Sequence, residues 1–295
     1  MEGFHRAALL KELLELLEIA PGMIVVDGTV GGGGHAEAVL EKMRGEGKLI
    51  GIDRDPEAIQ ASQELVKKFG ESVALVSGRF SCLLAHLKQL GIEKVDRIYF
   101  DLGVSSHQLE SAERGFSYKR NGPLDMRMNP NEGKPVSELI KSLEQAELER
   151  IFQEYGEEKF SNRVARAIIR ERKRGRNLDR TLEMAGLVKS AVGGSGAWVR
   201  SATRIFQALR IYVNQELEEL KEGLRAGLEA LKSGGRIAVI SYHSLEDRVV
   251  KNFYRENQKA GILRVLTEKP IVPSRAEVMN NPRSRSAKLR VAERI

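Results

Sequence analysis

The chain of 295 residues has little cysteine and few aromatic residues, and both shortages exclude classes of protein. Its single cysteine, Cys82, rules out an intrachain disulfide and a zinc site built from several cysteines. Aromatic residues make up 5% of the chain, so aliphatic side chains must fill most of the core. The five histidines are scattered and do not occur at the spacing of a metal site, so we expect no bound metal.

Long apolar runs are also missing. No stretch approaches the roughly 20 apolar residues of a membrane-spanning helix, and charges occupy the N-terminal positions where a secretion signal needs apolar residues. We therefore expect no membrane contact and a cytoplasmic location. The formal net charge of +7 mildly favours an anionic partner such as nucleic acid.

Hydrophobic periodicity predicts alternating helices and strands at both ends of the chain. The N-terminal part predicts helices over 6–19, 36–43 and 56–69, and buried strands over 23–26, 49–52, 74–76 and 97–100. The C-terminal part predicts a helix over 216–231, a strand over 236–241, a helix over 245–258 and a hairpin within 262–294. This alternation is typical of a mostly parallel sheet with helices on both faces, an α/β fold.

The residues between these two parts predict a different architecture. They carry helical patterns and loops without a convincing strand, and residues 115–135 are rich in Gly, Pro and Asn, as in an ordered loop. We therefore predict a discontinuous α/β domain, residues 1–109 and 214–295, split by an all-helical insertion domain, residues 110–213.

The strongest local motif is the glycine cluster DGTVGGGGH at residues 27–35, between a predicted strand and a predicted helix. Glycines let the backbone approach a ligand and present N–H groups at a helix N-terminus. Asp53 ends the second predicted strand, where a carboxylate can accept both ribose hydroxyls of an adenosine. Together these features predict a nucleotide-type ligand.

Three such ligands compete for the loop. A phosphate-binding loop is disfavoured because His35 and Ala36 follow the glycines, where that motif has Lys and Ser or Thr. A dinucleotide stays possible, since the spacing fits a permissive G-x-G-x-x-(G/A) pattern. However, Asp27 beside the loop would repel a pyrophosphate, whereas S-adenosylmethionine has no phosphate and carries a sulfonium and an ammonium. Electrostatics thus favours S-adenosylmethionine.

Polar residues follow two further predicted strands. Ligands of open α/β sheets bind at the carboxyl ends of the strands, which makes Asp101 and His243 candidate catalytic residues. Each also has a structural interpretation, Asp101 as a helix cap and His243 as a hydrogen-bonding side chain.

Eight segments, several of them long and unusual, occur in order along nearly the whole chain. They are DGTVGGGGH (27–35), IDRDP (52–56), DLGVSSHQL (101–109), ERGFS (113–117), GPLDMRM (122–128), TRIFQALRIYVNQELEEL (203–220), SYHSLEDRVVK (241–251) and NPRSRSAKLR (281–290). Together they resemble the bacterial 16S rRNA cytosine-N4 methyltransferase family. The resemblance implies a class I methyltransferase fold with a helical insertion and S-adenosylmethionine as donor. The implied substrate is the N4 amine of one cytosine in the decoding region of 16S rRNA, within the small ribosomal subunit.

The resemblance also implies which residues bind the donor. Its methionine end would lie on Gly33, Gly34 and His35, its ribose on Asp53 and its adenine on Phe80, with Asp101 and Gln108 completing the pocket.

The chemistry adds its own requirement. Transfer to an exocyclic amine is an in-line displacement, in which a hydrogen-bond acceptor must orient the amine. Asp101 is a candidate for this role, although its implied donor contact competes with it. Methylation at cytosine C5 would instead need a thiolate, but the pattern around Cys82 predicts a small buried apolar residue.

A basic stretch lies within the predicted insertion. On a helix, Arg163, Arg166, Arg170 and Lys173 share one face, and Val164, Ala165, Ile168 and Ile169 share the other. We expect the basic face to contact RNA phosphates, helped by C-terminal residues Arg275, Arg283, Arg285, Lys288 and Arg290, although a solvated face has the same pattern. Alternative functions are a methyltransferase for another amine in DNA or protein, and a donor-binding ribosome assembly factor.

Overall fold

The computed structural model describes residues 7–193 and 196–295, which fold into two compact units. The first unit comprises the chain up to Gly103 together with Leu217–Ile295, and the second is Val104–Glu216. Within the described ranges, none of the helices has the length and apolar character needed to span a membrane.

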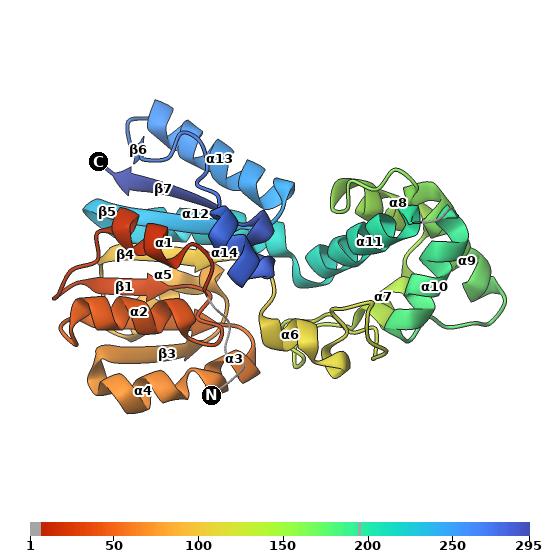
Figure 1. The fold of residues 1–295 in the computed structure, drawn as a ribbon, viewed down its shortest axis with the longest axis horizontal. Coiled ribbons are helices and arrows are strands. Elements are labelled where there is room, and N and C mark those ends of the chain that lie inside the picture. Colours follow the sequence, from red (N-terminus) through yellow and green to blue (C-terminus); the bar gives the residue numbers. More distant parts are fainter. Residues whose placement is uncertain (1–6, 194–195) are drawn as a thin grey trace. The chain divides into compact units, whose positions relative to one another are not determined.

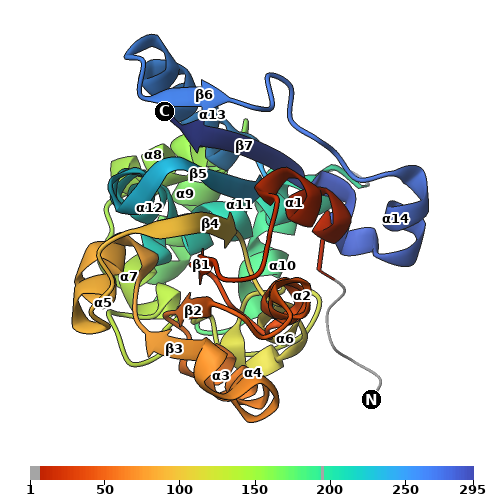
Figure 2. The same ribbon diagram turned by 90° about the vertical axis from the view of Figure 1, so that its left-hand side faces the viewer.

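A seven-stranded sheet forms the centre of the first unit, and Figure 2 shows its strands in the order β3-β2-β1-β4-β5-β7-β6. The strands are β1 (Ile24–Asp27), β2 (Lys48–Asp53), β3 (Val73–Ser77), β4 (Val95–Asp101), β5 (Leu231–Ser241), β6 (Leu263–Val265) and β7 (Lys288–Arg294). The first five run parallel, while β7 runs antiparallel between β5 and β6. This is the class I S-adenosylmethionine-dependent methyltransferase fold, as predicted.

Helices cover both faces of the sheet (Figure 1). One face carries α1 (Leu10–Leu17), α2 (Gly34–Met43), α3 (Pro56–Ala61) and α4 (Gln63–Phe69), and the other carries α5 (Leu83–Gln89), α12 (Glu216–Ala230) and α13 (Ser244–Lys259). Neighbouring strand residues alternate between the two cores, Val25 in one and Val26 in the other, as the two-residue period of a strand requires. The short helix α14 (Arg275–Asn280) precedes β7.

Three predicted elements differ from the structure by more than two residues or are divided in it. The helix predicted over 6–19 is limited to Leu10–Leu17, because Leu9 and Glu18 have left-handed backbone angles; residue 6 lies outside the described range. The helix predicted over 56–69 divides at Ser62, whose hydroxyl donates to the carbonyl of Gly31 (2.9 Å). Strand β5 begins earlier than predicted, because Leu231 already pairs with Val95 before an irregularity in the ladder.

The second unit is helical, with α6 (Ser106–Glu110), α7 (Val136–Ser142), α8 (Gln145–Glu154), α9 (Ser161–Lys173), α10 (Thr181–Val192) and α11 (Ala197–Asn214). Its core is separate from the two sheet cores. We placed its limits at 110 and 213, whereas the compact unit spans 104–216. Val104 and Leu109 pack on its core, and Asn214 bonds both Met126 and Met128 there, which explains the wider limits.

Candidate functional site

The glycine loop connects β1 to α2 in a conformation that requires glycine at two positions. A Cβ atom on Gly28 would lie 2.3 Å from the Phe100 ring, so only glycine fits there. Gly33 has φ +84° and caps α2. Helix α2 then begins at Gly34, so its first N–H groups face the end of the loop. These groups suit a negatively charged ligand atom, such as a carboxylate oxygen.

Asp53 is tied to this loop at the end of β2. Its Oδ2 accepts the N–H of Gly31 (2.9 Å), and its Oδ1 accepts the N–H of Asp55 (2.9 Å). Burial raises the pKa of Asp53 to about 6, although both hydrogen bonds act in the opposite direction. The structure thus brings Asp53 to the glycine loop, as the spacing of the two motifs predicted.

Asp101 ends β4 and is held by two hydrogen bonds within the sheet unit. Its N–H donates to Thr29 Oγ1 in the glycine loop (2.7 Å), and its Oδ1 accepts the hydroxyl of Tyr242 (2.8 Å). Its Oδ2 lies 3.4 Å from Nδ1 of His35, and 23% of its side chain stays exposed. A carboxylate has about four lone-pair sites, so Asp101 can accept a further hydrogen bond.

The structure shows that the expectation for Asp27, a charge that repels a pyrophosphate, is wrong. The side chain is 1% exposed, and its two oxygens accept the hydroxyl of Tyr99 (2.8 Å) and the N–H of Thr29 (3.0 Å). Burial raises its pKa to about 7. Asp27 is therefore an internal, partly protonated group rather than the exposed charge that would repel a pyrophosphate. The partly exposed carboxylates beside the loop are Asp53 and Asp101.

His35 follows the loop on α2 and is also buried. Its Nε2 donates to the carbonyl of Ala8 (3.0 Å), because a carbonyl oxygen only accepts. Burial lowers its pKa, so the neutral ring presents its unprotonated Nδ1 to Asp101.

The comparison with known proteins agrees with this geometry. The MraW methylase family model matches residues 2–295. The chain belongs to this family. A ribosomal RNA small subunit methyltransferase H from Trichlorobacter lovleyi is 45% identical over 313 residues and covers 100% of both chains. A protein of the same name from Geobacter sulfurreducens is 45% identical and covers 99% of both. An rRNA methylase structure from Streptococcus thermophilus, 12% identical with TM-score 0.47, covers 99% of both, a likeness too low to carry an argument.

In this methylase, Phe80 lies in the turn after β3, with its ring 4.7 Å from that of Phe100. The turn is held by Glu219 of α12, whose carboxylate accepts the N–H and the hydroxyl of Ser81 (both 3.0 Å). Glu219 is 5% exposed and was missed, because its position in the leucine-rich helix pattern gives no signal of a buried partner.

Tyr242 was also missed, although its signal was present. It directly follows β5, where the sequence reasoning selected its neighbour His243 instead. Burial raises the pKa of Tyr242, so its hydroxyl stays protonated and donates to Asp101. Tyr242 therefore fixes the orientation of the candidate catalytic carboxylate.

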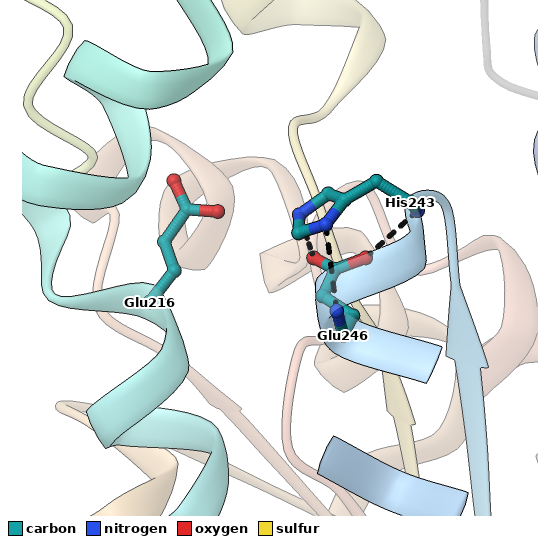
Figure 3. Close-up of side chains that lie close together, drawn as sticks. All are labelled: Glu216, His243 and Glu246. Atoms are coloured by element: carbon teal, nitrogen blue, oxygen red, sulfur yellow. Dashed lines mark hydrogen bonds and ion pairs between the residues drawn. The ribbon is translucent and has the colours of Figure 1, made fainter. Parts of the chain in front are cut away.

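His243 caps α13 through contacts with Glu246 (Figure 3). Its Nδ1 accepts the backbone N–H of Glu246 (3.4 Å), and Glu246 Oε2 accepts the backbone N–H of His243 in return (3.3 Å). The Nε2 atom of His243 also lies 3.1 Å from Glu246 Oε1. This reciprocal capping box gives His243 the structural role that we left open. Glu216, also drawn there, belongs to the helical unit, where it accepts two hydrogen bonds from Arg210 (2.9 Å each).

Five further predicted site residues belong to the helical unit. Gln108 belongs to the helical unit, where it completes a capping box with Ser105 on α6. The basic residues Arg163, Arg166, Arg170 and Lys173 are exposed on α9, while Val164, Ala165 and Ile168 are buried on its other side. Ile169, also predicted on the apolar side, packs against the core of the helical unit but is only partly buried. The two faces are thus confirmed apart from Ile169, which lies at their border.

Two predictions are wrong. Cys82 is exposed rather than buried, because it ends a turn before α5, and Leu83 and Leu87 occupy the buried positions of that helix. Arg290 of the C-terminal segment is buried and bonds Asp247 (2.6 Å), so it is engaged within the sheet unit rather than offered to RNA. Although burial acts to raise the pKa of Asp247, the hydrogen bond and charge of Arg290 lower it.

Proposed function

We propose that this methylase transfers the methyl group of S-adenosylmethionine to the N4 amine of a cytosine in the decoding region of 16S rRNA. The observation that carries the proposal is family membership over nearly the whole chain, together with the positions of Gly33, Asp53 and Asp101. Gly33 lies in the loop after β1, and Asp53 and Asp101 end the two neighbouring strands β2 and β4. The names of the relatives support a small-subunit rRNA substrate.

The donor-binding roles follow the geometry of the loop. The methionine carboxylate would meet the N–H groups at the start of α2, where Gly33, Gly34 and His35 lie. Asp53 would accept the ribose hydroxyls, and Phe80 would pack on the adenine. Gln108 stays a proposed donor contact by resemblance alone. We expect no metal to take part.

Asp101 would accept a hydrogen bond from the cytosine amine. Tyr242 donates a hydrogen bond to its carboxylate, and part of the Asp101 side chain is exposed, where the amine would donate to it. A lone pair of the amine would then point toward the sulfonium methyl, as an in-line displacement requires. The amine nitrogen forms the new bond to carbon, and the carbon–sulfur bond breaks with its electron pair left on the sulfur of adenosylhomocysteine. The proton of the methylated amine passes to the Asp101 carboxylate and from there to solvent.

The substrate would be held by the helical unit. We propose that Arg163, Arg166, Arg170 and Lys173 on α9 contact RNA phosphates, which positions the RNA without reading its sequence. The target cytosine would enter the site single-stranded or flipped from a helix.

One experiment separates this function from its alternatives. Purified chain is incubated with labelled S-adenosylmethionine and unmethylated small ribosomal subunits, and the RNA is digested to nucleosides. Label in N4-methylcytidine supports the proposal, and label in C5-methylcytidine, in protein or only in DNA controls overturns it. Binding of adenosylhomocysteine without any transfer would indicate an assembly factor. Tight binding of NADH without binding of adenosylhomocysteine would indicate a dinucleotide enzyme.

A further inference from the structure

An open groove of about 650 Å³ lies in the helical unit, and its charge is confined to one side. The α9 side carries five basic residues, Arg163, Arg166, Arg170, Lys173 and Arg174. The remaining lining includes Ser190 of α10 and Gln145 at the start of α8, which are polar and uncharged. The groove is therefore an asymmetric site rather than a uniformly basic surface.

The positive charge of the groove is only partly neutralised by the protein. In the described part of α9 and the turn after it, Glu171 forms ion pairs with Arg170, Arg174 and Arg176. Over the same residues no carboxylate lies within ion-pair distance of Arg163, Arg166 or Lys173. Because like charges at this spacing repel one another, the cluster favours an anionic occupant.

The spacing of the basic residues suits a chain of phosphates. Positions 163, 166, 170 and 173 are three or four residues apart on a helix, so they form a row about 15 Å long. This length matches a few consecutive nucleotides. Arg163 also lies over the ring of Phe160 (5.2 Å), which holds its guanidinium in place.

The uncharged side of the groove suits sugars and bases. Ala167 and Ala191 are small, so they leave open volume in the groove, and Ile169 adds an apolar surface. The hydroxyl of Ser190 and the amide of Gln145 each donate and accept hydrogen bonds, as ribose 2′-hydroxyls and base edges require.

We propose that this groove binds a single-stranded segment of the rRNA substrate, with phosphates along α9 and riboses and bases toward α10. The proposal rests on the proposed function, which supplies RNA as the ligand. A duplex is disfavoured, because helices in contact have axes only about 8–10 Å apart, so the groove between them accommodates one strand.

The test uses the full chain and a labelled single-stranded RNA of about 12 nucleotides, with its blunt duplex for comparison. Binding is measured by fluorescence anisotropy over a range of salt concentrations. For the variant Arg163→Gln/Arg166→Gln/Arg170→Gln we expect at least about tenfold weaker single-strand binding and a salt slope smaller by about two, from 0.7 per phosphate contact. The matched control, Lys42→Gln/Lys88→Gln/Lys259→Gln, removes three exposed charges from helices of the sheet unit and should stay near wild type.

A second variant tests the groove itself. Ser190→Trp fills the groove at an exposed position without changing charge, and we expect about tenfold weaker single-strand binding with an unchanged salt slope. If this variant binds like wild type, or if both triple variants weaken binding equally, α9 is only a charged face and the proposal fails. Duplex or polyphosphate binding as tight as single-strand binding also overturns it.

Methylation of small ribosomal subunits, measured in parallel, separates this proposal from the proposed function. If wild type places no methyl on cytosine N4 while the groove variants still lose RNA binding, the proposed function is wrong and the proposed RNA site is supported. If wild type methylates cytosine N4 and the groove variants bind and methylate equally well, the proposed RNA site is wrong and the proposed function is supported.

Discussion

The two units of this methylase place their functional charges in opposite environments. In the sheet unit, Asp27 and Glu219 are almost fully buried and Asp101 is partly buried, each in hydrogen bonds of 3.0 Å or less. In the helical unit, Arg163 and Arg166 are exposed on one helix. Buried polar groups lose much when one partner is removed, whereas exposed charges act additively and are screened by salt. Single substitutions of the buried groups in the first unit should therefore have large effects, and single substitutions of the exposed charges in the second should have graded effects.

The largest effect is expected at Asp101. The variant Asp101→Ala removes the only carboxylate we assign to the amine, and we expect methyl transfer to fall about 10²–10⁴-fold. Turnover on small ribosomal subunits and binding of adenosylhomocysteine should both be measured, because Asp101 is also a proposed donor contact. Wild-type turnover with the donor still bound would show that another group orients the amine.

Asp27 should control the pH dependence of stability. The folded chain keeps its proton up to about pH 7, whereas the unfolded chain releases it near the ordinary value of 3.8. The folded state thus binds more protons in this window, so the free energy of unfolding falls as pH rises, by at most about 4 kcal/mol from this residue.

The variant Asp27→Asn tests this expectation, because an amide can still bond Tyr99 and does not titrate. Urea unfolding at several pH values between 4 and 8 should show a flatter dependence than wild type. Asp53 contributes in the same direction in both proteins, so the difference isolates Asp27. Equal pH dependence of the two proteins would mean that Asp27 does not hold a proton.

A smaller effect is expected at Tyr242. The variant Tyr242→Phe keeps the ring and removes the hydrogen bond to Asp101, so we expect about 10–100-fold lower kcat/KM, the value of one hydrogen bond to a charged group. The melting temperature should change little. A normal kcat/KM would mean that Tyr242 only packs in the site.

In the helical unit a single substitution should have a graded effect. We expect Arg166→Gln to weaken RNA binding a few-fold and to lower the salt slope by about 0.7. Lys42→Gln on α2 is the matched control for the removal of one exposed charge. A loss of RNA affinity as large as that of the triple groove variant would mean that the basic residues act cooperatively. Exposed charges in the helical unit would then not act additively, as we expect them to.

The smallest effect is expected at Cys82. Since this residue is exposed, burial no longer argues against its use as a nucleophile, and only the chemistry of N4 transfer does. We expect Cys82→Ser to methylate small ribosomal subunits within twofold of wild type. Loss of activity with an unchanged melting temperature would favour methylation at cytosine C5.

Local patterns were sufficient for the fold class and for part of the site. The alternation of strands and helices predicted the parallel sheet, and the C-terminal hairpin was recovered as β6 and β7. Gly33, Asp53 and Asp101 were found because loops at the carboxyl ends of parallel strands necessarily meet at one edge of the sheet. The faces of α9 followed from the helical period alone.

Contacts between distant segments were decided only by the tertiary structure. Tyr242 meets Asp101 across 141 positions, and Glu219 meets Ser81 across 138, and neither pair has a sequence pattern of its own. The burial of single residues was also decided only by the tertiary structure. Asp27 and Cys82 each occupy a position whose local pattern suggests the wrong exposure, because burial depends on which other elements pack over a residue. Sequence periodicity determines which face a residue lies on, whereas packing of the complete sheet determines what that face meets.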